Sequence, residues 1–232
     1  MGEWGKRQVS PGVVGRGLKV RATSCYIAAV SDLTYYERNL PHRLPPGEVI
    51  FVTFRLAGSL PLEVLAQLRA EAELLQQGCG PDPVAQYAER KRYFGRFDAL
   101  LDGTAYGPTW LRQPEISALI IRALHYPDGK SYTLLGYCVM PNHVHLVVAL
   151  PENAPPLAVT LQRLKGYSAL QANRLLGLSG TFWQAESYDH VVRPGELARI
   201  MHYVLQNPVK AGLVADWEKW PYSFMARCSA DF

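Results

Sequence analysis

The sequence has few cysteines, and none of them stands near another. The four are Cys25, Cys79, Cys138 and Cys228. Zinc clusters and disulfide frameworks need closely spaced or paired cysteines, so this pattern argues against both and favours reduced thiols.

Long hydrophobic runs are also missing. No apolar stretch approaches the roughly 20 residues that a membrane span needs. The N-terminus contains glycines and basic residues but no apolar core, unlike a secretory signal. We therefore expect a soluble, cytoplasmic protein with no membrane partner.

A strong charge of either sign is absent as well. The chain has 24 Lys and Arg against 20 Asp and Glu, a formal net charge of +4. This mildly basic balance is compatible with a nucleic-acid partner but does not demand one. Hydrophobic residues make up 48% of the 232 residues, which is enough for a packed core in one domain with extensions.

Glycines interrupt any hydrophobic period near the N-terminus, so residues 1–34 are predicted to be a poorly structured extension. Residues 35–232 are predicted to form a single domain with an insertion at about 79–115. The insertion contains prolines, glycines and the basic-aromatic stretch 90–97, and we expect short helices and loops there.

The rest of the domain alternates between strand and helix patterns. The predicted strands are 48–56, 132–140, 143–150 and 182–192, and the predicted helices are 62–77, 115–125, 157–176 and 196–206. This order indicates an α+β fold, with helices packed on one antiparallel or mixed sheet.

Two histidines, His143 and His145, are two residues apart in a predicted strand. Side chains at this spacing point to the same face, so both imidazoles could reach one metal ion. Apolar residues surround them, and buried imidazoles without partners would be costly. The pair could also be a chance occurrence or two structural polar groups.

A tyrosine and an asparagine, Tyr203 and Asn207, are four residues apart on the last predicted helix and would share a face. A phenol is a poor nucleophile at neutral pH unless a cation or base assists it. A metal ion at the histidine pair could do so, and the Asn207 oxygen could complete its ligands. Alternatively, Tyr203 is a core residue and Asn207 ends the helix before Pro208.

Several segments resemble the HUH single-tyrosine transposases, in particular their REP-associated branch. The resemblance covers about residues 35–225, and a PNHVH motif followed by a YxxxNPVKAG block is its most specific part. The segments that carry it are 36–60, 136–148, 182–193, 199–214 and 220–223.

The resemblance implies a ferredoxin-like α/β sandwich, with the histidine pair on a central strand and the tyrosine on a C-terminal helix. Tyr203 matches the nucleophile. His143, His145 and Asn207 match the ligands of Mg²⁺ or Mn²⁺, although some relatives carry glutamine in the last position. The implied product is a 5′-phosphotyrosine link to single-stranded DNA with a free 3′-OH, and rejoining reverses the step.

Such an enzyme needs basic groups for phosphates and aromatic rings for unpaired bases. A polar cluster at Tyr188, Asp189 and His190 precedes the tyrosine helix. Asp189 could orient a ligand, and His190 could be a third histidine ligand, which is less favoured than Asn207. The candidate DNA contacts are Arg90, Lys91, Arg92, Tyr93, Arg96, Arg163, Lys165, Arg174 and Lys210.

The sequence thus predicts a metal-dependent single-stranded DNA endonuclease and strand transferase that acts on hairpin or palindromic repeat DNA. A mobile-element transposase that moves its own element is one alternative, and a hairpin-DNA-binding protein without cleavage activity is another. A replication initiator or relaxase is less favoured. We expect a monomer rather than a homodimer.

Overall fold

The computed structural model describes most of the chain from residue 35 onward. The predicted extension 1–34 lies outside these residues. Within the described part, no helix is long and apolar enough to cross a bilayer. The described ranges are 35–37, 41–43, 45–78, 82–103 and 105–226.

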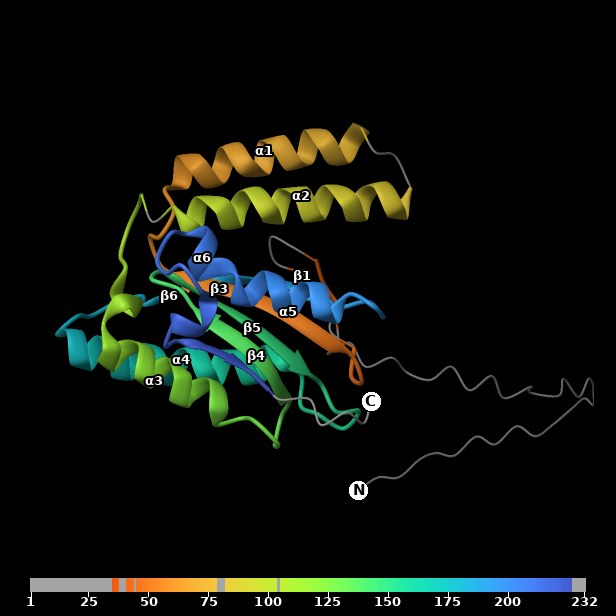
Figure 1. Cartoon of the computed structure of the whole chain (residues 1–232). Helices are drawn as coiled ribbons and strands as arrows, with labels where there is room; N and C mark the ends of the chain where they lie inside the picture. The colour runs from red at the N-terminus through yellow and green to blue at the C-terminus, as the bar shows by residue number, and fades with distance from the viewer. Residues whose placement is uncertain (1–34, 38–40, 44, 79–81, 104, 227–232) are drawn as a thin grey trace, which may run out of the picture. The chain divides into compact units, whose positions relative to one another are not determined.

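The core of the fold is an antiparallel five-stranded sheet with the order β6-β3-β5-β4-β7 (Figure 1). Within this sheet, strands β3, β4, β5 and β6 and the helices between them follow the β-α-β-β-α-β order of a ferredoxin-like fold, and β7 is added beside β4. The predicted α+β class is therefore confirmed, and β5 is the central strand. The strands are β3 (Val49–Leu56), β4 (Thr133–Val139), β5 (His143–Ala149), β6 (Trp183–Val191) and β7 (Ser223–Met225).

Two short strands that precede this sheet in the sequence form a separate antiparallel pair. They are β1 (Tyr35–Glu37) and β2 (Pro41–Arg43).

One face of the sheet is covered by α3 (Pro114–His125) and α4 (Leu157–Leu176), which lie below it in Figure 1. Alternate strand residues such as Phe54 and Leu146 point to this side, as the period of a strand requires. They pack with Ile120 and other apolar helix residues into the larger hydrophobic core.

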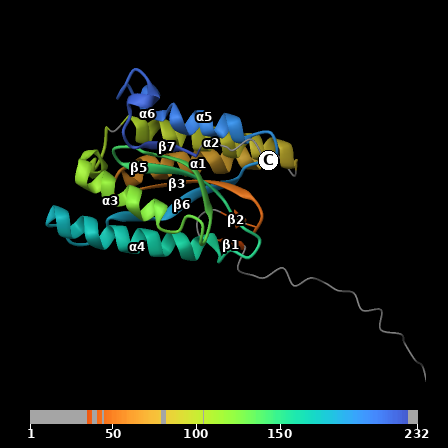
Figure 2. The same cartoon turned by 60° about the horizontal axis from the view of Figure 1, so that its bottom comes forward.

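The opposite face carries α2 (Pro83–Asp102) and α5 (Leu197–Leu205), and Figure 2 shows both on the other side of the sheet from α3 and α4. The intervening strand residues point here: Phe51 and Val147 pack with Phe94 and Val204 in a second core. This face is the one that carries the odd-numbered residues of β5.

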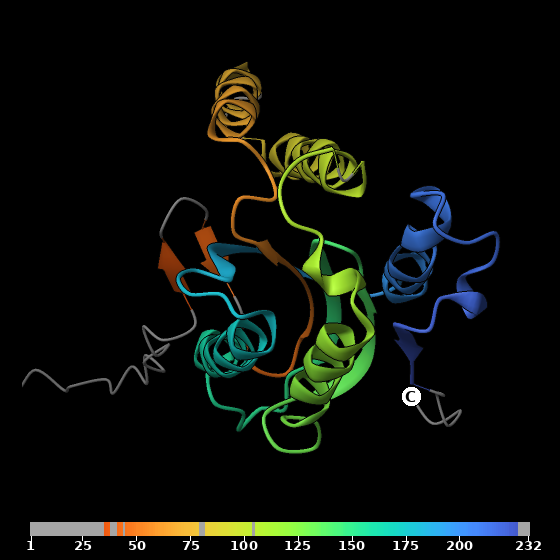
Figure 3. The same ribbon diagram turned by 90° about the vertical axis from the view of Figure 1, so that its left-hand side faces the viewer.

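The remaining elements lie around these layers. α1 pairs with α2 as a helical hairpin, and α6 follows α5 directly, as Figure 3 shows from the side. The elements are α1 (Leu62–Gly78), η2 (Trp110–Arg112), α6 (Asn207–Lys210) and η3 (Trp217–Lys219).

The prediction of short helices and loops in the insertion is wrong for residues 83–102, because α2 is one helix of 20 residues. It holds for residues 105–112, which form a loop and the short helix η2. Asp82 caps its start by accepting a hydrogen bond from the Val84 amide (3.0 Å), and Pro83 suits the first turn. The stripe that faces the sheet contains Phe94 and Leu101 but also the buried Asp98. A carboxylate on the inner face interrupts the hydrophobic period by which a helix is recognised.

A glycine in the loop after α2 fixes how this loop meets the turn after β3. Gly107 has φ of +69°, and a Cβ there would overlap the backbone of Gly58 and lie 2.8 Å from Ser59 Cα. The loop can therefore pass the turn only with a glycine at this position.

We predict that Gly107→Ala destabilises the fold by more than the ~1–2 kcal/mol that a left-handed conformation alone costs. Gly129→Ala is the matched control, because Gly129 has φ of +70° but nothing within 4 Å of the added Cβ. Urea unfolding of both variants measures the difference, and equal losses would contradict the close approach at Gly107.

Candidate active site

The two histidines of β5 converge on one point beneath α2 and α5. Both are fully buried, and their Nε2 atoms lie 3.0 Å apart. On the outer side, Asn142 Oδ1 is 2.7 Å from His143 Nδ1, and Thr53 Oγ1 is 2.8 Å from His145 Nδ1. Such partners on the outer nitrogens orient imidazoles so that the inner nitrogens face a shared ligand.

Both imidazoles are neutral at ordinary pH. Burial lowers the pKa of each to about 3, with smaller contributions from His145 at His143 and from Lys210 at His145. The neutral imidazole is the form that binds metal ions.

A carboxylate from α2 completes this cluster. Asp98 is 1% exposed, and its Oδ1 lies 3.4 Å from His145 Nε2 and 3.8 Å from His143 Nε2. Because both imidazoles are neutral, these contacts are not ion pairs. Burial raises the pKa of Asp98, against the lowering effect of His143.

The Asp98 Oδ1 atom is buried without a hydrogen-bond partner among the described residues. A buried oxygen without a donor is costly, and here it faces two converging imidazole nitrogens. The ligand atoms of Asp98, His143 and His145 all lie within 4.8 Å of one another. One carboxylate and two imidazoles suit a divalent metal ion, so this group could hold one.

Asn207 begins α6 and is fully buried beside the cluster. When its amide nitrogen donates to Asp102 (2.8 and 3.0 Å), its oxygen lies 2.9 Å from His145 Nε2. Burial, and then the neighbouring Asp98, raise the pKa of Asp102 to about 7. The structure thus brings Asn207 to the histidine pair, as the sequence-based ligand hypothesis requires.

Tyr203 reaches the same cluster from α5 of the same chain. Its hydroxyl donates a hydrogen bond to Asp98 Oδ2, and its ring centroid is 5.9 Å from that of His145. Lys210 Nζ lies 4.0 Å from the centre of the ring. Burial and then Asp98 raise the pKa of the phenol, so it is protonated unless a cation assists it.

Gly136 on β4 lets α5 come this close to the sheet. A Cβ at this position would contact the Met201 side chain of α5 and lie 3.0 Å from the Phe224 carbonyl oxygen of β7. The tight packing of α5 on β4 therefore helps to set where Tyr203 stands.

The basic-aromatic stretch of α2 lies near the site but is largely paired. Lys91 binds Glu196 (3.0 Å), Arg92 binds Glu89, and Arg96 binds Glu71 (2.5 Å). Arg90 is exposed and Tyr93 is partly buried. Their role as DNA contacts remains a prediction.

The basic residues of α4 lie on the face of the sheet opposite to the histidine pair. Lys165 donates to the carbonyl oxygens of Gln184 (2.6 Å) and Ala185 (3.0 Å), and so ties α4 to β6. Arg163 and Arg174 are exposed. Of the predicted DNA contacts, Lys210 is the one that touches Tyr203.

His190, the alternative third histidine, lies 3.1 Å from the Tyr87 hydroxyl and 3.6 Å from Glu196. It is not part of the group that could hold a metal ion among the described residues. Asp189, its neighbour, has an interaction in the structure, and its supporting role is still a prediction.

Sequence reasoning missed Asp98 and Asp102 because they lie in the insertion, far from the histidine and tyrosine motifs. One signal was present: the two aspartates stand four residues apart in the otherwise apolar stretch 97–102. Carboxylates at this spacing share one face of a helix.

Comparison with known proteins identifies similar sequences. The family described as "Transposase IS200 like" matches residues 120–207. A protein of Haemophilus influenzae, provisionally assigned as a REP-associated tyrosine transposase, is 32% identical over 113 residues, covering 44% of this chain and 62% of the relative. The REP-associated tyrosine transposase of Escherichia coli K12 is 26% identical over 99 residues, covering 42% and 57%.

The chain spans about 60% of the length of these curated relatives. A solved structure of a REP-associated tyrosine transposase bound to a REP hairpin is 18% identical, with a TM-score of 0.45 over 81% of this chain and 80% of that one. The sequence matches confirm the resemblance to the REP-associated branch.

We predict that the Asp98, His143 and His145 group binds Mn²⁺. At about 100 times its Kd, the ion should stabilise the folded chain by about 2.7 kcal/mol and raise Tm by roughly 5–10 °C. His145→Ala should lose this shift. His202→Ala should keep it, because His202 is exposed.

Thermal unfolding of EDTA-treated protein, with and without Mn²⁺, measures the shift. An undiminished shift in His145→Ala would place the ion elsewhere.

Proposed function

We propose that this chain cuts and rejoins single-stranded DNA beside a hairpin. It resembles the REP-associated tyrosine transposases and matches the IS200-like family over residues 120–207. The nucleophile is Tyr203. Mg²⁺ or Mn²⁺ is held by His143, His145 and Asp98, with the Asn207 oxygen as a further ligand.

The observation that carries this proposal is the position of the Asp98 carboxylate between two functional groups. Its Oδ2 accepts the hydrogen bond of the Tyr203 hydroxyl, while its Oδ1 faces the two imidazole nitrogens. One side chain therefore connects the candidate nucleophile to the candidate metal ligands. A core tyrosine with an unrelated structural role does not need this arrangement.

The bound ion would polarise a phosphate oxygen and stabilise the negative charge that develops on it. The protein residues position the nucleophile and the phosphate. Asp98 holds the phenol oxygen beside the ligand group, and Lys210, which lies over the Tyr203 ring, adds positive charge near the incoming phosphate.

In the proposed reaction, the Tyr203 oxygen forms a bond to phosphorus, and the bond from phosphorus to the 3′ oxygen of the preceding nucleotide breaks. The phenol proton leaves through the Asp98 carboxylate that accepts its hydrogen bond. The leaving oxygen takes up a proton from solvent and becomes a free 3′-OH, and Asp98 later releases the phenol proton to solvent. Attack of a 3′-OH on the phosphotyrosine reverses the step and joins the strands.

We further propose that one chain forms a complete site. Tyr203 of α5 and His145 of β5 meet within the same chain, with ring centroids 5.9 Å apart, so no exchange of helices between subunits is required. This arrangement favours a monomer that acts in cis.

The main rival is a hairpin-DNA-binding protein that has no cleavage activity. Binding DNA does not require a buried, unpartnered carboxylate oxygen facing two buried imidazoles, and this arrangement costs stability. Cleavage chemistry explains this cost, so it is the favoured function.

We predict that Tyr203→Phe abolishes covalent attachment to single-stranded hairpin DNA but leaves binding within about twofold, because the ring is retained and only the nucleophilic oxygen is lost. An SDS-resistant adduct formed with Mn²⁺ measures attachment. EDTA should remove the wild-type adduct, and Tyr126→Phe, an exposed tyrosine after α3, should form it normally. Attachment by Tyr203→Phe would exclude this nucleophile.

A mixing experiment tests the cis arrangement. We predict that Tyr203→Phe and His145→Ala proteins, each inactive alone, remain inactive when mixed, because each chain lacks one half of its own site. Recovery of up to about a quarter of the wild-type cleavage rate would instead indicate a dimer that shares its tyrosine helices.

A further inference from the structure

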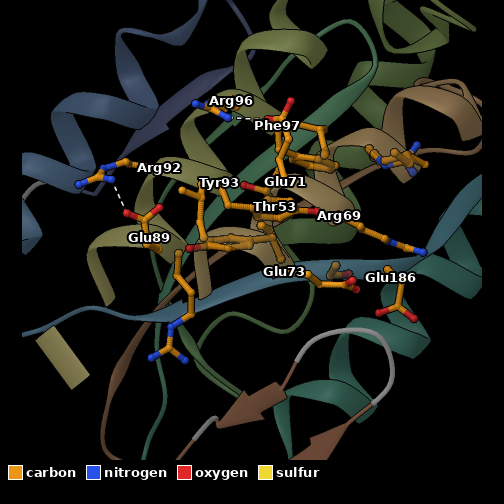
Figure 4. A pocket seen from close by; sticks show the side chains of 18 of the residues that line it. Thr53, Arg69, Glu71, Glu73, Glu89, Arg92, Tyr93, Arg96, Phe97 and Glu186 are labelled. Carbon is orange, nitrogen blue, oxygen red and sulfur yellow. Dashed lines mark hydrogen bonds and ion pairs between the residues drawn. The ribbon is translucent and has the colours of Figure 1, made fainter. Parts of the chain in front are cut away.

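A pocket of about 400 Å³ lies between the helical hairpin α1–α2 and strands β3 and β6. Arg69 comes from α1, Tyr93 and Phe97 come from α2, and Thr53 and Arg55 form part of the lining on β3. Figure 4 shows the labelled side chains around this space. Its volume is in the usual range for a small-molecule pocket.

The pocket borders the candidate active site. Thr53, which lines it, has its Oγ1 2.8 Å from His145 Nδ1. Phe97, also in the lining, precedes Asp98 in the chain. A group in this pocket would therefore lie one side chain away from the proposed metal ligands.

Arg55 is the residue that points to a ligand. It is 5% exposed, and its guanidinium donates to Ser59 Oγ (3.0 Å) and lies 5.8 Å from the centre of the Phe97 ring. In the part of the chain that the structure describes, no carboxylate pairs with it. A buried cation without an anionic partner is costly, so acceptor atoms of a bound group would offset this cost.

The other lining residues suit a nucleotide base more than a bare phosphate. Tyr93 and Phe97 present near-parallel rings, 6.3 Å apart at an angle of 20°, and unpaired bases stack on such rings. Five arginines and four glutamates line the pocket, and Glu71 and Glu89 are paired with Arg96 and Arg92. This nearly balanced charge would not attract several phosphates, whereas base edges offer both acceptors and amino donors.

We propose that this pocket holds one unpaired base of the DNA strand, next to the phosphate that Tyr203 attacks. Arg55 donates to the acceptor atoms of the base, the aromatic rings of α2 contact its face, and Arg69 at the rim contacts the adjoining phosphate. This inference rests on the proposed function and gives the α1–α2 hairpin a role in choosing where the strand is cut.

The test uses the full chain with Tyr203→Phe, so that binding is measured without cleavage. The probe is a fluorescent stem-loop oligonucleotide with about eight unpaired nucleotides of mixed sequence on the 5′ side of its stem. Each unpaired nucleotide is replaced in turn by an abasic residue. Fluorescence anisotropy gives the Kd for each probe.

We expect one abasic position to weaken binding about tenfold, as the loss of a stacked base does. Adding Tyr93→Ala should weaken binding of the intact probe by a similar factor and make it insensitive to that abasic position. Arg69→Glu should also weaken binding, and it serves as a second variant because Arg69 is exposed. Arg122→Ala, an exposed arginine on α3 across the sheet, should preserve the wild-type pattern.

The outcomes separate this inference from the proposed function. The inference is overturned if no abasic position matters, if the probe does not bind, or if Tyr93→Ala and Arg69→Glu leave the pattern unchanged. In that last case, the cleavage function is still supported if the chain that keeps Tyr203 forms a covalent adduct with the same probe. If Tyr203→Phe gives the expected abasic pattern but the chain that keeps Tyr203 forms no adduct, the base pocket is supported and the cleavage function is rejected.

Discussion

The burial of two imidazoles on the central strand is the constraint around which this structure is arranged. His143 and His145 are fully enclosed, so each nitrogen needs a partner or a ligand. Asn142 and Thr53 occupy the outer nitrogens. The inner nitrogens face Asp98, Asn207 and the oxygen-rich space between α2 and α5. The helices on this face therefore supply polar groups as well as apolar cover.

The α1–α2 hairpin has two roles in this arrangement. Its inner helix closes the second hydrophobic core through Phe94 and delivers Asp98 to the tyrosine and the histidines. The space it leaves against β3 and β6 is the proposed base pocket, which meets the site at Thr53. A segment that the sequence presents as an insertion thus links a proposed chemical step to a proposed choice of substrate.

Polar interactions at the site are strong because water is largely excluded. Burial lowers the pKa values of both histidines to about 3 and raises that of Asp102 to about 7, so the protein favours neutral groups where no cation is bound. A divalent ion reverses this preference, since it stabilises the carboxylates and leaves the imidazoles neutral as ligands. The site is therefore costly to the fold by itself and suited to an ion.

The sequence by itself determined the α+β class, the strand that carries both histidines on one face, and the helix that carries Tyr203, because strand and helix periods are local properties. The length of α2 was not predicted, since Asp98 interrupts its apolar face. That Asp98 joins Tyr203 to the histidines, and that Arg55 lies buried beside Phe97, depends on contacts between residues 42 or more positions apart. Only tertiary packing brings such groups together, because no local pattern encodes which helix covers which face of a sheet.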